Sequence, residues 1–254
     1  MRINTGRLTA VVRKEFREYL RSRSIVGTMV VLPLVFLIQP LGIIFGESPL
    51  SPAGQVQKLV GSVFLILLIT PAILPAVVAA YSVVGERDQG TLEPLLTTPV
   101  RREELLLGKA LAVIAPSVII AYVTFALIEV AAQLFARNPA VATALGQGPH
   151  VLAEILFAPL LAGWSSWVGI GISARSSDAR VAQQLGTLAS LPPLGVAALM
   201  AFNVITPSVT IAVVFGVGLL AADLVMWRVV SAMFDRERLI TGAKAPKPSV
   251  ATGR

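Results

Sequence analysis

Six long apolar runs, separated by short polar segments, dominate the chain. Each run has about 20 residues or more and almost no charge, which is the pattern of helices that span a membrane. The sequence therefore predicts an all-α integral membrane protein in three parts: an amphipathic helix over residues 1–24, a six-span domain over 25–230 and a partly disordered tail over 231–254. The predicted spans cover residues 25–45, 59–84, 110–135, 151–174, 185–205 and 209–230.

The pattern is weakest between the fifth and sixth spans. Only residues 206–208 separate them, and Pro192 and Pro193 lie inside the fifth. Each proline removes a backbone donor and clashes with the preceding turn, so we expect that helix to kink or break there. A re-entrant pair, which enters and leaves the membrane on one side, is the alternative for this stretch.

Basic residues indicate how the spans are oriented. Of the 21 Lys and Arg residues, all but Lys58 and Arg137 precede the first span, follow an even-numbered span or lie at or beyond the end of the last one. Because basic residues gather on the cytoplasmic side, both termini and the loop over 85–109 are expected there. This distribution also requires an even number of spans, and it predicts a multi-pass protein of the cell membrane.

Composition then limits the chemistry. The chain is 55% hydrophobic and 14% charged, has no cysteine and has one histidine, His150. Soluble domains carry about 25% charged residues. Thiol chemistry is excluded and a metal site is disfavoured. The net charge of +7 fits topology and anionic lipid better than nucleic acid. We find no residue arrangement that argues for catalysis, so we expect no enzyme.

The N-terminal segment over 7–22 is predicted to be an amphipathic helix beside the first span, which suits a membrane surface. Glu15 falls inside its apolar arc. This carboxylate either pairs with a neighbouring Arg and reaches solvent, or contacts another part of the protein or a partner subunit. The apolar arc contains Leu8, Val11, Val12, Phe16, Tyr19 and Leu20, and Arg13, Lys14, Arg17 and Arg21 lie opposite.

The loop between the second and third spans has readable local signals. Gly90 can end the preceding helix, and Thr91 is a good N-cap for a short helix with Glu93 in its first turn. Thr98 and Pro99 can start the helix that enters the third span. The prediction is a short helix with docking leucines, and an ordinary capped loop with solvated charges is the alternative.

Three segments of the chain resemble the ABC type-2 transporter permeases. The run GERDQGTLEPLLTTPVRREELLLGK resembles their signature, E-x-x-x-G-T-x-E-x-L-L-x-T-P followed by R-x-E and G-K. RKEFREYLRSRS resembles their connecting helix, and MFDRERLIT resembles the stretch after their last span. Pro94 and the short first external loop depart from the pattern. The matching positions are Glu86, Gly90, Thr91, Glu93, Leu96, Thr97, Pro99, Arg102, Glu104 and Lys109.

The resemblance implies the transmembrane permease subunit of an ATP-driven ABC exporter. Two such subunits, identical or related, would pair with cytoplasmic ATP-binding subunits, and the short helix with Leu95 and Leu96 would seat in the ATPase as a coupling helix. This chain lacks a phosphate-binding loop, because Gly108-Lys109 is followed by Ala110 and lacks the first glycine. ATP and Mg²⁺ are therefore expected on the partner, and no cofactor on this chain.

Two other function classes stay open: a membrane anchor for assembly or signalling, and an ion-driven secondary transporter. The latter class usually shows repeats and more intramembrane carboxylates.

Asp223 lies in the sixth predicted span. Placing an aspartate at mid-membrane costs about 2.5–3.5 kcal/mol, so we expect Asp223 to serve either in a structural hydrogen bond or in the transport path. Glu129 and Glu154 are expected to reach the interface. Ser165, Gly169 and Ser173 recur every four residues, which favours close helix packing.

Overall fold

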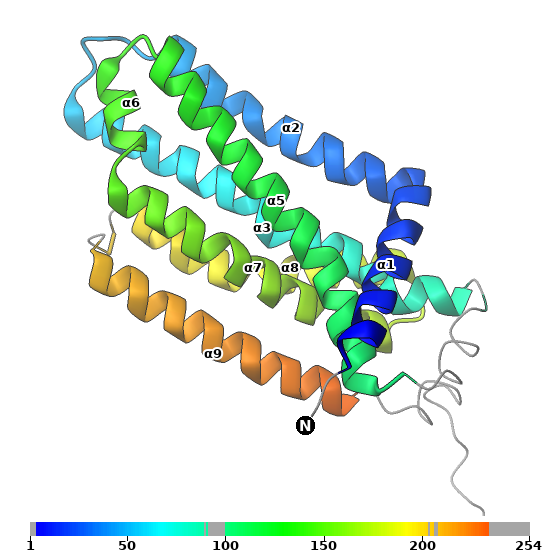
Figure 1. Cartoon of the computed structure of the whole chain (residues 1–254). Helices are drawn as coiled ribbons and strands as arrows, with labels where there is room; N and C mark the ends of the chain where they lie inside the picture. The colour runs from blue at the N-terminus through cyan, green and yellow to red at the C-terminus, as the bar shows by residue number, and fades with distance from the viewer. Residues whose placement is uncertain (1–3, 89, 91–99, 203, 206–207, 234–254) are drawn as a thin grey trace, which may run out of the picture.

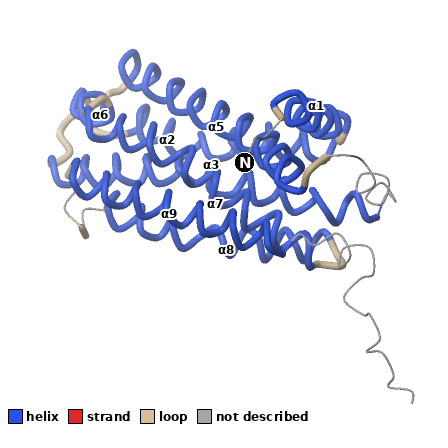
Figure 2. Tube along the Cα trace, turned by 60° about the horizontal axis from the view of Figure 1, so that its bottom comes forward, coloured by secondary structure: helices blue, strands red, loops and turns tan. Residues whose placement is uncertain are grey.

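The computed structural model describes residues 4–88, 90, 100–202, 204–205 and 208–233, and within these ranges the chain contains helices and no strands (Figures 1 and 2). The predicted all-α class is confirmed. The helices are α1 (Thr5–Arg21), α2 (Arg23–Gly46), α3 (Ala53–Asp88), α5 (Arg102–Phe135), α6 (Pro139–Leu145), α7 (Gly148–Arg175), α8 (Ala179–Ala201) and α9 (Val209–Met233).

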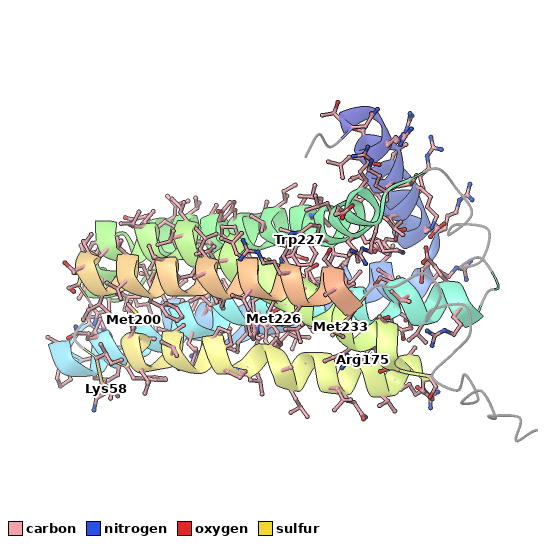
Figure 3. All side chains as sticks on the ribbon, turned by 90° about the horizontal axis from the view of Figure 1, so that it is seen from below. Lys58, Arg175, Met200, Met226, Trp227 and Met233 are labelled. Atoms are coloured by element: carbon pink, nitrogen blue, oxygen red, sulfur yellow. The ribbon has the colours of Figure 1, made fainter. Side chains whose placement is uncertain are left out.

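Six of the helices form a bundle, and each is long and apolar enough to cross a membrane: α2, α3, α5, α7, α8 and α9. In Figure 1, α1 lies across one end of this bundle, and α6 lies at the opposite end. We call the first the loop end, because α3 ends and α5 begins there, and the second the far end. Figure 3 shows Lys58 and Met200 toward the far end and Arg175 and Met233 toward the loop end.

Helices α3 and α7 form the centre of the bundle. In the 18-residue apolar stretch of each helix, 72% is buried in α3 and 67% in α7, whereas only 22% is buried in α2 and in α9. Because lipid is as apolar as a side chain, the apolar faces of α2 and α9 can remain on the outside. The periphery is therefore suited to lipid or to another subunit, and the centre to the protein's own packing.

Small residues of α7 bring it close to α3, as their spacing predicts. A Cβ atom on Gly169 would lie 2.8 Å from the Cβ atom of Ala79, so only glycine fits there. The Ser173 hydroxyl donates to the carbonyl oxygen of Ala80 at 2.6 Å and accepts from the backbone N–H groups of Val83 and Val84 at 3.1 Å. This inter-helix contact is the kind that small and hydroxylated residues provide within a bilayer.

Of the two outcomes expected at Pro192 and Pro193, a kink or a break, the break is wrong, because α8 passes through both prolines as one helix of 23 residues. Pro193 cannot donate to the carbonyl of Ala189, but the indole N–H of Trp164 on α7 donates to that oxygen at 3.0 Å. A neighbouring helix thus satisfies a group that proline leaves free. Since α8 and α9 are separate helices of span length, two spans are favoured over a re-entrant pair.

Helix boundaries differ from the prediction in two other places. Thr98 and Pro99, the expected helix start, lie outside the described residues, but Val100 and Arg101 are described and are not helical, so α5 begins at Arg102. The predicted external loop over 137–150 contains the short helix α6. Asn138 caps α6, accepting from the N–H of Ala140 at 2.9 Å. An N-cap followed by proline is a recognised start signal for a helix.

Candidate functional site

The two helices that carry the 89–101 connection come together at its base through a buried ion pair. Helix α3 ends at Asp88, next to Gly90, which has a positive φ of 68° as a helix-ending glycine often does. On α5, the ammonium nitrogen of Lys109 lies 2.8 Å from the carboxylate of Glu86 on α3. The two ends of the connection are therefore held to each other.

Lys109 is fully buried, with no solvent-exposed area, yet its charge is compensated. Besides Glu86, its ammonium group donates to the carboxylate of Glu15 at 3.0 Å and to the carbonyl oxygen of Ser82 at 2.8 Å. Three acceptors match the three hydrogens of an ammonium group. Because an uncompensated buried charge is costly, Lys109 binds α1, α3 and α5 together.

A second lysine completes the arrangement from α1. The ammonium group of Lys14 lies 2.8 Å from the Glu86 carboxylate and 3.2 Å from those of Glu15 and Glu18. One oxygen of Glu15 and one of Glu86 therefore each bridge both lysines. We call Lys14, Glu15, Glu18, Glu86 and Lys109 the charge cluster.

The three carboxylates of the charge cluster have the spacing of a metal site, with ligand oxygens within 4.8 Å of one another. Two ammonium groups already stand against these oxygens, at Lys14 and Lys109. The lysines thus supply the positive charge that a cation would otherwise supply, and the cluster reads as a structural joint. Its charges are paired with one another across three helices, so the role that its geometry supports is mechanical.

Electrostatics keep the α1 side of the cluster charged at neutral pH. Burial opposes the charge on Glu15, but Lys109 and Lys14 outweigh it and hold the pKa of Glu15 below its ordinary value of 4.5. Burial likewise opposes the charge on Lys14, and the surrounding carboxylates, Glu15 and Glu86 foremost, raise its pKa above the ordinary 10.5. Tyr19 donates to Glu15 at 3.3 Å. Burial and the Glu15 charge raise the pKa of Tyr19 well above 10.

A second contact attaches the start of α1 to the start of α5. Glu104 is buried, and its two carboxylate oxygens accept the backbone N–H groups of Asn4 at 2.9 Å and Arg101 at 3.1 Å. Arg7 adds an ion pair at 4.0 Å. A carboxylate in the first turn of a helix also complements the positive end of the helix dipole. Helix α1 is thus fixed to α5 at two points.

Between these two points, α1 and α5 touch at a glycine. A Cβ atom on Gly108 would overlap the side chain of Val11. The Gly108-Lys109 pair therefore has a joint role, in which the glycine lets α1 approach and the lysine binds it. The helix ends that flank the 89–101 connection are therefore both tied to α1.

The predicted site residues fall into two groups. Glu86, Gly90, Arg102 and Glu104 are described, and Glu86 and Glu104 belong to the contacts above. Thr91, Glu93, Leu95, Leu96, Thr97 and Pro99 lie outside the described residues, so the proposed short helix stays a prediction.

For Glu15, the alternative that it reaches solvent is wrong, and the alternative that it contacts another part of the protein is confirmed, since it is 1% exposed and paired with Lys109. The pairing itself was not predicted, although the sequence contains its signal. Glu15 is the acidic residue inside the apolar arc of one helix, and Lys109 is the basic residue inside the apolar stretch 105–114 of another.

Asp223 faces protein, as predicted. It is 8% exposed and lies against Gly163 of α7, where a Cβ atom would be 2.8 Å from its carboxylate. One turn further along, Trp167 and Trp227 stack edge to face at 5.0 Å, and Figure 3 shows Trp227 on α9. The close fit of Gly163 and Asp223 joins α7 to α9.

Glu154 does not reach the interface as expected. It is fully buried, and neither of its carboxylate oxygens has a hydrogen-bond partner in the described part of the chain. Glu129 is half-buried and accepts from the side-chain amide of Gln133 at 2.9 Å. At the far end, a small cavity of about 60 Å³ is lined mainly by apolar side chains, with His150 and Ser208 as polar exceptions.

These observations define a multi-pass helical membrane protein whose first helix is ion-paired with the ends of its second and third long helices. A family model described as ABC-2 family transporter protein matches residues 9–234, which is most of the chain. The chain therefore belongs to the ABC-2 family and is the membrane subunit of an ABC transporter. No curated protein matches it.

Proposed function

We propose that this chain is the permease subunit of an ATP-driven exporter, and that residues 85–109 receive the force from a separate ATP-binding subunit. The charge cluster is the observation that carries this proposal. It joins both helices flanking the 89–101 connection to α1 through ion pairs of 2.8 and 3.0 Å, and to each other through one of 2.8 Å. A connection needed only to link two spans has no use for such a joint.

The mechanism follows from how force passes through ion-paired and packed contacts. ATP and Mg²⁺ bind on the partner subunit, and its closure moves residues 89–101, which we call the coupling segment. Because Glu86 and Lys109 hold the two flanking helices together, the segment moves α3 and α5 as a unit, and α1 with them. Since α3 is packed on α7 at the centre, the displacement reaches the remaining spans. Two subunits, identical or related, then open the path alternately to each side.

In this proposal the loop end faces the cytoplasm and the protein lies in the cell membrane. The basic residues support this orientation, because Lys58, at the far end in Figure 3, is one of only two outside the cytoplasmic set. The chain has no cysteine, so a single introduced cysteine reports its own position. Cysteine at Gly90 should be protected from a membrane-impermeant maleimide in intact cells, and cysteine at Gly54 should react. The reverse pattern would overturn the orientation.

The proposed function is tested by co-expressing the chain with the ATP-binding protein encoded nearest to its gene. We expect the tagged chain to purify with that protein as a complex that hydrolyses ATP. A variant of the partner that lacks the lysine of its phosphate-binding loop should lose ATP hydrolysis but stay in the complex. The proposal would be overturned if the chain purified alone and no candidate ATPase bound to it, whether encoded nearby or elsewhere in the genome.

A second candidate, an ion-driven transporter, is favoured by one observation. Glu154 and Asp223 are buried carboxyl groups, and each has at least one oxygen without a partner in the described residues. Intramembrane carboxyl groups often mark ion pathways. Transport into sealed vesicles distinguishes the two candidates. ATP without an ion gradient should drive transport by an ATP-driven exporter, and an ion gradient without ATP should drive transport by an ion-driven transporter.

A further inference from the structure

The outer surface at the junction of α1 and α2 combines two features, a row of cations and an apolar groove. Arg13, Arg17 and Arg21 recur every four residues on α1 and are exposed, and Arg23 begins α2. No ion pair joins these four arginines to any other residue in the described ranges. The nearest acidic groups are engaged elsewhere, since Glu15 and Glu18 pair with Lys14.

The edge of α1 beside this row is apolar. Phe16 is 42% exposed and Leu20 is 59% exposed. On the opposite flank of these two residues, Val12 and Tyr19 pack with Ile25 and Met29 of α2. The exposed apolar edge therefore lies between the span and the arginine row, which is the order of acyl chains and headgroups in a leaflet.

The groove is a shallow, open depression that begins at Arg23 and ends at Phe36, and its lining residues all belong to α2. It has a volume of about 520 Å³, and its lining includes Gly27, Thr28, Val31, Val35 and Phe36. Gly27 deepens it, because a Cβ atom there would touch nothing within 4 Å. At a rise of about 1.5 Å per residue the groove is about 20 Å long. One leaflet contributes about 15 Å to the hydrocarbon core, so the groove covers the depth of an acyl chain.

We propose that this surface binds one anionic phospholipid of the leaflet at the loop end. Its phosphate lies among Arg21, Arg23 and the neighbouring arginines, and one acyl chain lies in the α2 groove. Arginine matches phosphate oxygens in geometry as well as charge. A second copy of the chain fits this surface less well. A two-fold contact here would place one arginine row against the other, and like charges oppose such a contact.

The test uses the full-length purified chain in detergent, with phosphatidylglycerol or phosphatidylcholine added, and native mass spectrometry counts the lipids retained. Wild type should keep one phosphatidylglycerol per chain and lose phosphatidylcholine. Gly27→Leu fills the groove without an internal clash, and Arg23→Gln removes a cation. Each should lower phosphatidylglycerol retention about fivefold or more.

Gly42→Leu is the matched control, because it lies on the same helix and also has nothing within 4 Å of a Cβ position. It should retain phosphatidylglycerol as wild type does. Equal retention of both lipids by wild type, or equal retention by the Gly27 and Gly42 variants, would overturn the proposal. The proposal would also be overturned if Gly27→Leu abolished a dimer of the chain but left phosphatidylglycerol retention unchanged, because this face would then be an interface between copies.

Discussion

The ammonium group of Lys109 lies 3.0 Å from the carboxylate of Glu15, and both side chains are almost completely removed from solvent. One residue comes from the first helix of the chain and the other from the helix that follows the proposed coupling segment. Their contact explains why a glutamate stands within an otherwise apolar helix face. It also makes α1 part of the apparatus that positions the segment.

Removal of Lys109 should destabilise the protein strongly. Lys109→Met leaves Glu15 and Glu86 buried with one cation fewer, and breaking a buried pair from one side costs about 3–5 kcal/mol. Thermal unfolding in detergent measures this. Lys58→Met, at an exposed site of the far end, should leave stability unchanged. The double variant with Glu15→Gln should lose less than the sum of the two single losses. Additive losses would mean that the two groups do not interact.

Gly108→Ala should separate α1 from α5. The added methyl group overlaps Val11, and overpacking of this kind costs about 1–3 kcal/mol. Gly85→Ala is the control, because its Cβ atom would meet only the Cβ atom of Tyr81 at an ordinary 3.9 Å. Limited proteolysis within α1 and thermal unfolding report the effect. If both alanine variants behave as wild type, close approach of the helices is not required at Gly108.

The sequence predicts much of this architecture because span-length apolar runs carry a strong signal. It also placed Glu86 and Glu104 among the site residues. It did not predict the charge cluster, since pairing between Glu15 and Lys109 depends on where three helices meet. Of the kink or break expected at Pro192 and Pro193, the break does not occur, and the donor that satisfies the carbonyl group of Ala189 is Trp164 of another helix. Local propensity cannot include such tertiary partners.

Acid should remove the stability that Glu15 contributes. Its pKa is lowered in the folded protein, so its contribution is complete above the ordinary value of 4.5 and is lost as the pH falls through the lowered pKa. Wild type should therefore melt above Glu15→Gln by a constant margin from pH 7 to about pH 5, and the margin should shrink in stronger acid. A margin that grows as the pH falls would contradict the assignment.

Asp223 is predicted to be shielded from lipid by α7. A lipid-confined thiol reagent should label cysteine at Leu224, whose side chain is 56% exposed, and should spare cysteine at Asp223, which is 8% exposed. The chain has no cysteine of its own, so background labelling is absent. Equal labelling of both positions would mean that Asp223 faces lipid. Asp223→Asn should insert into the membrane normally. A change in transport would place the carboxyl group in the transport path, and a change in assembly would give it a structural role.

An ATP-binding subunit is expected to dock on the segment containing Leu95 and Leu96. The most direct measurement is the ATPase activity that co-purifies with the tagged chain after Leu96→Glu, compared with Gly54→Glu at the far end. A charge placed in an apolar contact should lower the co-purified activity about tenfold or more, with membrane insertion unchanged. Gly54→Glu should match wild type. If Leu96→Glu retains full ATPase activity and full transport, the segment is only a connector and the account is wrong.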